Sequence, residues 1–298
     1  MRKEIQRLQS DMERLGYITE PETATAVYLA QELRKPLLVE GDAGVGKTEI
    51  AKVLAACHGT ELIRLQCYEG LDVNTALYEW NYQRQLLRLK IAQENGRSVM
   101  EQEELIFSRD CLLERPLLQA ITRTGPPPVL LIDEIDRADD GFEAFLLEIL
   151  SDFQVTIPEL GTIVATITPH VVLTSNRTRE IGDALRRRCL YLFLDHPPLE
   201  KEIRIIQSRV PEVSERLSRE IAGFVQALRR RRLAKVPGAA ETIDWAAALV
   251  RLHTDRLDQE AVRLTLGCLI KDQRDAAELN QEIVNNLLDE AAAGVGSP

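Results

Sequence analysis

No stretch of the sequence comes near the roughly 20 consecutive apolar residues that a membrane-spanning helix needs. The N-terminus begins Met1-Arg2-Lys3-Glu4 and continues into Gln and Asp, without the apolar segment of a secretory leader. We therefore expect no membrane span and a cytoplasmic location.

The sequence also lacks paired cysteines. Its five cysteines are odd in number and widely spaced, and no two lie at the short separation that zinc sites and redox motifs use. We therefore expect no disulfide framework, but reduced and mostly buried thiols. The cysteines are Cys57, Cys67, Cys111, Cys189 and Cys268.

Positive charge is in deficit, because 37 Lys and Arg residues stand against 47 Asp and Glu residues, which gives a formal net charge of −10. A surface that neutralises a phosphate backbone needs the opposite balance, so we do not expect nucleic acid as a partner. The 45% hydrophobic and 28% charged content is that of a globular protein. A length of 298 residues predicts a large domain and a smaller one.

An alternation of strands and helices begins after Pro36. Short apolar runs between Pro, Gly or charged residues predict strands that are buried on both faces of a parallel sheet. Helical patterns separate them, among them 48–58, 74–94 and 110–123. This predicts an α/β fold with a parallel five-stranded sheet between helices. The predicted strands are 37–39, 62–65, 129–132, 171–174 and 190–194.

Beyond the last predicted strand the chain has only helical patterns. His196-Pro197-Pro198 predicts a linker, because two prolines cannot continue the strand and stiffen the chain. We predict a large α/β domain over 1–195, opened by a short helical segment, a linker over 196–200 and a small all-α lid domain over 201–298. Within the first domain, residues 153–167 predict two β segments around a turn, for which a hairpin is the simplest account.

A glycine-rich loop lies between the first predicted strand and the next helix. Gly41-Asp42-Ala43-Gly44-Val45-Gly46-Lys47-Thr48 matches the Walker A pattern in full. The glycines let backbone N–H groups face phosphate oxygens, and the N-terminus of the helix adds its dipole. In this interpretation Lys47 neutralises the β- and γ-phosphates of ATP, and Thr48 binds Mg²⁺ through its hydroxyl. A glycine-rich turn that arises by chance is the alternative.

Two acids follow the most strand-like run of the chain. A buried strand that delivers Asp133 and Glu134 at its carboxyl end has the Walker B form, and ligands of parallel sheets bind at that edge. Asp133 would complete the Mg²⁺ shell, and Glu134 suits a general base that orients and deprotonates the attacking water. An acid pair that only caps a helix is the alternative.

Further polar groups accompany the last two predicted strands. Asn176, at the end of one of them, would reach the same water, although asparagine is also ordinary turn chemistry. Arg186-Arg187-Arg188 precedes the other, and three crowded arginines favour an anionic partner such as the γ-phosphate bound by a neighbouring subunit. A solvated helix end that interacts with its dipole is the alternative.

With these residues the chain resembles the MoxR branch of the AAA+ ATPases, and more narrowly its CoxD-like subgroup, which serves carbon monoxide dehydrogenase maturation. The resemblance covers nearly the whole chain and rests on residues 38–49, 65–72, 133–139 and 174–176. It implies a P-loop AAA+ core followed by the helical lid, and a hexameric ring with nucleotide at each subunit interface. Asn176 takes the sensor 1 role, and Arg188, with Arg187, acts in trans as the arginine finger.

The resemblance also implies which residues contact the nucleotide. Gly16-Tyr17-Ile18 falls where AAA+ proteins hold adenine, although Tyr17 fits a plain core position equally well. The 153–167 hairpin is similar to the pre-sensor 1 insertion that faces the pore of the ring. The implied nucleotide-binding residues are Tyr17, Ile18, Gly41, Asp42, Ala43, Gly44, Val45, Gly46, Lys47, Thr48 and Glu49.

One departure from the MoxR pattern concerns the lid. The branch usually carries a sensor 2 arginine early in a lid helix, whereas residues 237–246 contain none. Residues 229–232 are four consecutive arginines that could substitute, although such a run is more often a solvated helix face.

The resemblance implies an ATP-driven remodelling chaperone, whose pore-facing hairpin transmits motion to a client protein. MoxR relatives usually act with a partner that carries a von Willebrand factor A domain, and by analogy the client is a metalloenzyme that awaits cofactor insertion or activation. A DNA-acting AAA+ motor or loader is the alternative, but the acidic balance and the lack of an appended nucleic-acid module disfavour it. A nucleotide-binding scaffold that does not hydrolyse ATP is a third.

Overall fold

The computed structural model describes residues 2–295, which form two compact units. The first unit holds the chain up to Leu8, Pro21–Glu40 and Thr48–Phe193. The second holds Gln9–Glu20, Gly41–Lys47 and the chain from Leu194 onward. The domain boundaries at 195 and 201 stay a prediction.

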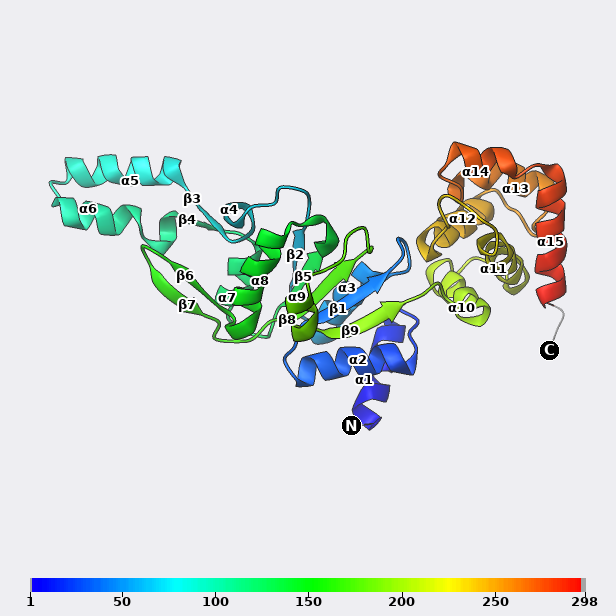
Figure 1. The fold of residues 1–298 in the computed structure, drawn as a ribbon, viewed down its shortest axis with the longest axis horizontal. Helices are drawn as coiled ribbons and strands as arrows, with labels where there is room; N and C mark the ends of the chain where they lie inside the picture. Colours follow the sequence, from blue (N-terminus) through cyan, green and yellow to red (C-terminus); the bar gives the residue numbers. More distant parts are fainter. Residues whose placement is uncertain (1, 296–298) are drawn as a thin grey trace. The chain divides into compact units, whose positions relative to one another are not determined.

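A five-stranded sheet forms the centre of the first unit, in the order β2-β5-β8-β1-β9 (Figure 1). β5 pairs in parallel with β2 and β8, and β8 pairs in parallel with β1. The register sets Ile132 beside Leu65 and Leu173, and all three side chains are buried. The strands lie where the apolar runs predicted them, and they are β1 (Leu37–Gly41), β2 (Leu62–Gln66), β5 (Val129–Asp133), β8 (His170–Ser175) and β9 (Leu190–Leu194).

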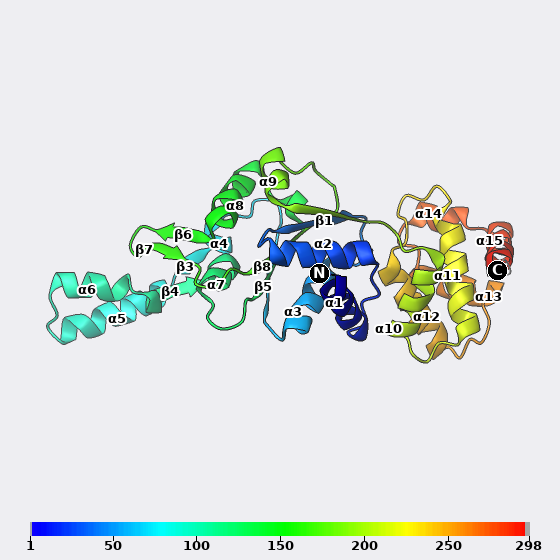
Figure 2. The ribbon, with the colours of Figure 1, turned by 90° about the horizontal axis from the view of Figure 1, so that it is seen from below.

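Helices join the strands and cover the sheet, as the two ribbon views show (Figures 1 and 2). Their apolar faces share one hydrophobic core with the sheet, in which Leu117 and Leu118 of α7 pack with Leu130 of β5. Full burial of each such side chain is worth about 1.5–3 kcal/mol. The helices before and between these strands include α1 (Arg2–Arg14), α2 (Pro21–Glu32), α3 (Lys47–His58), α7 (Pro116–Thr122), η2 (Ile135–Arg137), α8 (Asp140–Asp152) and α9 (Asp183–Arg188).

The structure differs from the prediction between β2 and β5. Residues 74–94 were expected as one helix, but they form a short helix, a strand and a longer helix, and a further helix follows that was not predicted. Asn81 separates the strand from α5, because its side chain accepts a hydrogen bond from the Arg84 N–H and so begins a new helix. The elements are α4 (Val73–Ala76), β3 (Tyr78–Trp80), α5 (Tyr82–Glu94) and α6 (Val99–Ile106).

The expected helix over 110–123 is wrong in its first half. Pro116 is the first residue of α7, and the residue before a proline is extended, so the chain cannot enter the helix earlier. η1 (Arg109–Cys111) and β4 (Leu112–Glu114) precede it, and β4 pairs antiparallel with β3. From this small sheet α5 and α6 extend away from the five-stranded sheet (Figures 1 and 2). We call α5, α6 and their connection the α5–α6 hairpin.

The hairpin predicted within residues 153–167 is confirmed. β6 (Gln154–Ile157) pairs antiparallel with β7 (Gly161–Val164). The hydroxyls of Thr156 and Thr162 lie 3.0 Å apart across the pair. Gly161 has φ +77°, a conformation that favours glycine and that closes the turn.

From Leu199 onward every regular element of the described chain is a helix, as predicted. Phe224 and Trp245 lie at the centre of this region with ring centroids 5.3 Å apart, and the indole N–H donates to Thr265 Oγ1 at 2.7 Å. No helix among residues 2–295 combines the length and apolar character that crossing a bilayer requires. The helices are α10 (Leu199–Arg209), α11 (Glu215–Arg229), α12 (Ala239–Arg251), α13 (Gln259–Thr265), η3 (Leu266–Cys268), α14 (Gln273–Glu278) and α15 (Gln281–Val295).

All five cysteines are free thiols. Cys67 and Cys111 are buried, and the other three are partly buried. Burial, and after it the negative charge of Asp133, raises the pKa of Cys67 to about 12, so this thiol stays protonated at neutral pH.

Candidate nucleotide site

The glycine-rich loop joins β1 to α3, as the sequence predicted. Gly46 has φ +96°, which a side chain would strain, and so the loop needs glycine there. The buried ammonium group of Lys47 donates to the carbonyl oxygens of Gly41 at 2.8 Å and Asp42 at 2.6 Å. Lys47 therefore lies over the backbone of its own loop, with its positive charge at the amino end of α3.

The first turn of α12 packs directly on this loop. A Cβ atom on Gly238 would lie 2.8 Å from the carbonyl oxygen of Ala43, so only glycine fits this approach. The Ala240 N–H donates to the Gly44 carbonyl at 3.2 Å, and the Glu241 carboxylate accepts from the Gly238 N–H at 2.9 Å. The bond from Gly238 to Glu241 closes a capping box within α12, and it holds the carboxylate beside the loop, since a Cβ atom on Gly44 would lie 2.9 Å from Glu241 Oε2. The sequence did not predict this contact between α12 and the loop.

Asp133 ends β5 as an almost fully buried carboxylate. Its Oδ1 accepts hydrogen bonds from Thr48 Oγ1 at 3.0 Å and Thr174 Oγ1 at 2.5 Å. The structure thus joins Thr48 and Asp133, the two residues that the sequence analysis assigned to Mg²⁺, by one hydrogen bond, and their role as metal ligands stays a prediction.

Arg64 of β2 is a residue of this region that sequence reasoning missed. Its Nε donates to Asp133 Oδ2 at 3.1 Å, and Nη2 reaches the same oxygen at 2.5 Å. The side chain of Arg64 is 51% exposed and that of Asp133 is 4% exposed. The sequence shows Arg64 as a charged residue within an apolar run, which indicates that one face of β2 is exposed. That Asp133 is the partner of Arg64 follows only from the pairing of β2 with β5.

Glu134 occupies a left-handed backbone conformation, with φ 56° and ψ 51°. Its N–H donates to Thr174 Oγ1 at 2.9 Å, which fixes the turn after β5. On the side chain, Oε1 accepts from Asn176 Nδ2 at 3.2 Å. Oε2 accepts from Gln66 Nε2 at 3.2 Å and lies 2.7 Å from Arg137 Nε. The structure therefore brings Asn176 and Glu134 together, and the prediction that both act on one water stays a prediction.

Asp136 fixes the position of Asn176. Its carboxylate accepts from the Asn176 N–H at 3.1 Å and from the Thr178 N–H at 2.9 Å. Burial alone would raise the pKa of Asp136, but these hydrogen bonds and one from the Thr178 hydroxyl outweigh it, and the pKa is lowered. Asp136 is therefore an ionised positioning group, a role that the sequence analysis did not assign to it.

The three consecutive arginines of α9 have different surroundings. Arg186 is used within the chain, because its Nη2 lies 3.5 Å from Glu40 Oε2 and its guanidinium lies over the ring of Tyr191. Arg187 and Arg188 are exposed, and their side chains form no ion pair or hydrogen bond within residues 2–295. Arg187 and Arg188, which the sequence analysis assigned as the arginine finger, are thus the two arginines of α9 whose guanidinium groups have no partner within these residues.

Tyr17 lies beside the loop, since a Cβ atom placed on Gly46 would be 3.6 Å from Cε2 of its ring. Tyr17 and Ile18 are both half-buried. An adenine contact through these two residues stays a prediction, as do the roles assigned to Val45 and Glu49.

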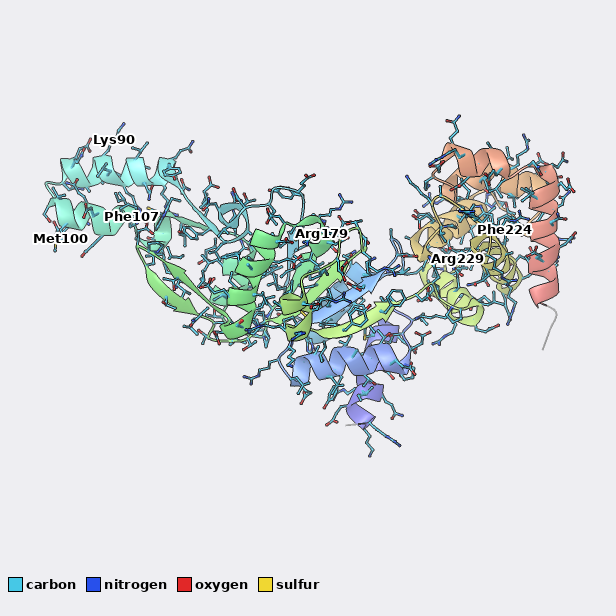
Figure 3. All side chains as sticks on the ribbon, viewed as in Figure 1. Lys90, Met100, Phe107, Arg179, Phe224 and Arg229 are labelled. Carbon is cyan, nitrogen blue, oxygen red and sulfur yellow. The ribbon has the colours of Figure 1, made fainter. Side chains whose placement is uncertain are left out.

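Arg229 is neither solvated nor available to replace the sensor 2 arginine, which corrects the exposed-face interpretation of the 229–232 run at this residue, whereas Arg230 and Arg232 are exposed. Its side chain is 7% exposed, and its two Nη atoms lie 2.7 Å from the two oxygens of Glu202, which is fully buried. Its Nε donates to the Pro237 carbonyl at 2.8 Å. Arg229 is labelled in Figure 3 within the C-terminal helices. This residue therefore ties α11 to α10 and to the segment before α12.

The donor groups fit a magnesium-bound nucleoside triphosphate. Hydroxyl and carboxylate oxygens, such as those of Thr48 and Asp133, are the protein ligands that Mg²⁺ uses together with phosphate oxygens. A lysine ammonium and a backbone of glycines in positive-φ conformations are the groups that hold triphosphates. The chemistry of these residues is thus consistent with the predicted ligand.

Comparison with known proteins identifies the family of the chain. The family model of the AAA domain (dynein-related subfamily) matches residues 36–189, just over half of the chain. An uncharacterized protein of Staphylococcus aureus (strain bovine RF122 / ET3-1) is 23% identical over 263 residues, which cover 84% of this chain and 92% of that protein. An uncharacterized protein of Staphylococcus haemolyticus (strain JCSC1435) is 23% identical over 262 residues, with coverage of 85% and 91%.

Among solved structures, the chain is similar to the RuvB Holliday junction branch migration motor of Thermotoga maritima. The TM-score is 0.44 at 17% identity, and the match covers 97% of this chain and 88% of that one. A mutant of the same RuvB gives a TM-score of 0.48 at 18% identity, with coverage of 99% and 83%. Because the family model spans more than half of the sequence, the chain belongs to the dynein-related subfamily of the AAA domain family, and it is an AAA+ ATPase.

Proposed function

We propose that this protein hydrolyses ATP in a Mg²⁺-dependent reaction, with Glu134 as the general base. The observation that carries the proposal is the pair of hydrogen bonds that connects Thr48 to Asp133 at 3.0 Å and Asn176 to Glu134 at 3.2 Å. These bonds gather Asp133, Glu134 and Asn176, at the carboxyl ends of β5 and β8, with Thr48 in the first turn of α3. Parallel sheets bind their ligands at this edge.

Each residue has a distinct part in this proposal. Lys47 and the backbone of Gly41–Lys47 bind the phosphates, and Thr48 and Asp133 are the groups that would hold Mg²⁺. Bound Mg²⁺ supplies charge neutralisation on the transferred phosphoryl group. Glu134 accepts a proton from the attacking water, and Asn176 orients that water through its amide. Asp136 keeps Asn176 in place through two backbone N–H groups.

The proposed active form is a ring of identical subunits, most simply a hexamer. Arg187 and Arg188 support it, because exposed guanidinium groups without partners among residues 2–295 are suited to a phosphate bound by a neighbour. A guanidinium placed at the γ-phosphate raises the rate of phosphoryl transfer by roughly 10³–10⁵ in P-loop enzymes. Nucleotide would then lie at each subunit interface.

We further propose that ATP turnover remodels a client protein. The β6–β7 hairpin is present, as expected for the segment that would contact the client. By resemblance to the MoxR branch and its CoxD-like subgroup, the client is a metalloenzyme in maturation, the partner carries a von Willebrand factor A domain, and the location is cytoplasmic. Hydrolysis that is stimulated by DNA, and not by protein, would contradict this part.

The test compares the wild type with Glu134→Gln and with Glu260→Gln, a matched change at an exposed residue of α13. Phosphate release and the binding of a fluorescent ATP analogue are measured with Mg²⁺ and with a chelator. Glu134→Gln should bind nucleotide yet lose about 10²–10⁴ in hydrolysis rate, as expected for loss of a general base. Glu260→Gln should match the wild type. Undiminished hydrolysis by Glu134→Gln overturns the assignment of the base.

A further inference from the structure

The α5–α6 hairpin exposes an unusual amount of apolar surface. The turn Asn95-Gly96-Arg97 joins its helices, and Gly96 has φ +65°. Exposed apolar side chains that gather on helices extending from a domain mark a contact with another macromolecule. The exposed apolar residues of α5 are Tyr82 at 66%, Leu86 at 60%, Leu87 at 59% and Ile91 at 49%, and those of α6 are Val99 at 73% and Met100 at 70%.

The two helices already use one face each to pack on one another. Gln85 Nε2 donates to the Ile106 carbonyl at 2.8 Å, and Ala92 is 2% exposed between the helices. These positions of α5 are seven residues apart and lie on one face. The exposed apolar residues lie on the remaining faces. Figure 3 shows Lys90 of α5 and Met100 of α6 on opposite sides of the hairpin. The hairpin thus has two separate outer faces.

The outer faces carry opposite charge. α5 contains Arg84, Arg88 and Lys90 against a single acid, Glu94, in its last turn. Arg88 is engaged within the hairpin, because its Nη2 lies 2.7 Å from Asp110 Oδ2. The exposed side chains of Arg84 and Lys90 form no ion pair within residues 2–295. The outer face of α5 is therefore apolar and basic.

The outer face of α6 carries the charge opposite to that of α5. α6 contains three glutamates and no basic residue. Glu101 is used in the capping box with Ser98, whereas the exposed carboxylates of Glu103 and Glu104 have no ion-pair partner in the described chain. They flank Met100 at helical spacing. The outer face of α6 is therefore apolar and acidic.

We propose that the α5–α6 hairpin is a contact between subunits, in which the outer face of α5 in one copy docks on the outer face of α6 in the next. The partner is a second copy of this chain because one chain carries both complementary faces. A contact between two different patches is head-to-tail, and it generates a closed ring when the rotation between copies closes. Apolar residues supply contact area, and Arg84 and Lys90 meet Glu103 and Glu104. This inference rests on the ring of the proposed function and names a contact that holds it.

Charge reversal tests the contact. The double variants Arg84→Glu with Lys90→Glu, and Glu103→Lys with Glu104→Lys, each place like charges against one another in every interface. The control is Arg251→Glu with Arg263→Glu, which reverses two exposed arginines of α12 and α13 that form no ion pair with any other described residue. Assembly with ATP is measured by sedimentation velocity over a range of protein concentrations, and thermal melting confirms that each variant is folded.

Each reversed variant alone should need roughly tenfold or more higher concentration to assemble, while the control assembles as the wild type does. A 1:1 mixture of the two reversed variants should assemble again when the variants alternate. The acidic α5 of the first then faces the basic α6 of the second, and the basic α5 of the second faces the acidic α6 of the first. Assembly that is unchanged in both reversed variants overturns the inference. So does a mixture that does not assemble although both components are folded, or a wild type that stays monomeric.

These outcomes separate the contact from the proposed function. If Glu134→Gln hydrolyses ATP normally while charge reversal weakens assembly, the assignment of the general base fails and the hairpin contact holds. If Glu134→Gln is inactive while charge reversal leaves assembly unchanged and abolishes binding of a partner protein, the ATPase proposal holds and the hairpin is a partner surface.

Discussion

The guanidinium group of Arg64 lies on the carboxylate of Asp133, with Nε 3.1 Å from Oδ2. Because Thr48 and Thr174 already donate to the other carboxylate oxygen, both oxygens of Asp133 are engaged by this chain's own side chains. The residue that is proposed to hold Mg²⁺ is therefore bound to a competing cation, and the metal must displace or accommodate Arg64.

Substitution of Arg64 by Met should lower the Mg²⁺ concentration that gives half-maximal ATP hydrolysis. Arg64 is half-exposed, so solvent screens the pair and its removal is worth about 1 kcal/mol, or roughly fivefold in apparent affinity. A Mg²⁺ titration of turnover measures the shift, with Arg123→Met as a control, since this arginine is similarly exposed and pairs with Glu61 outside the site. An unchanged or higher Mg²⁺ requirement would show that Arg64 does not compete with the metal.

Loss of Arg229 should destabilise the C-terminal helices. Arg229→Ala leaves the buried Glu202 carboxylate without its cation, which costs about 3–5 kcal/mol. Replacement of the pair by Met at Arg229 and Leu at Glu202 should recover most of this loss. Arg230→Ala, at an exposed position next to it, should change stability by less than about 0.5 kcal/mol.

Urea denaturation measures the free energy of unfolding of Arg229→Ala, of the double replacement and of Arg230→Ala. An Arg229→Ala protein as stable as the wild type, but with slower ATP turnover, would contradict the structural role and would favour a contact between Arg229 and the nucleotide.

Stability should fall as pH drops from 6.5 towards 4. Burial, and secondly the nearby His58, lowers the pKa of His170 to about 4, and the two imidazole rings stack with centroids 5.0 Å apart. The pKa of His58 is lowered as well, by burial. The unfolded chain binds more protons in this window, so the stabilisation is complete above pH 6.5 and is lost as pH approaches 4.

Because His170 is only partly buried, its share of this loss is on the order of 1–2 kcal/mol. His170→Asn should flatten the fall of the unfolding free energy over this range, whereas His253→Asn, at an exposed residue of the helical region, should leave the slope unchanged. An identical slope in His170→Asn would contradict the assignment.

The central sheet and the phosphate loop could be predicted because their signals are local. Residues 129–132 form an unbroken apolar run that ends in two acids, and such a run between prolines and acids is typical of a strand buried on both faces. The Walker A pattern likewise fixes a loop between strand and helix through its own glycines. The predicted strands match the observed ones because the residues of each segment specify it without distant partners.

The insertion between β2 and β5 could not be predicted, because its two strands are three residues each and pair across a long separation. Tyr78 lies opposite Glu114, and nothing near either residue in sequence specifies the other. The role of Arg64 depends in the same way on the register of β2 against β5. Arg229 was misread because a run of arginines on an isolated helix favours solvent, and only α10 supplies the buried carboxylate that reverses this preference.

The most direct measurement of the central claim is ATP hydrolysis by a mixture of two inactive proteins. One is Glu134→Gln, which keeps Arg187 and Arg188, and the other is Arg187→Ala with Arg188→Ala, which keeps Glu134. If the arginines act on a neighbour's nucleotide, mixed assemblies contain complete sites, and the mixture should hydrolyse ATP well above the sum of its components. A mixture as inactive as its components, although it assembles, would contradict a site completed by the neighbouring subunit.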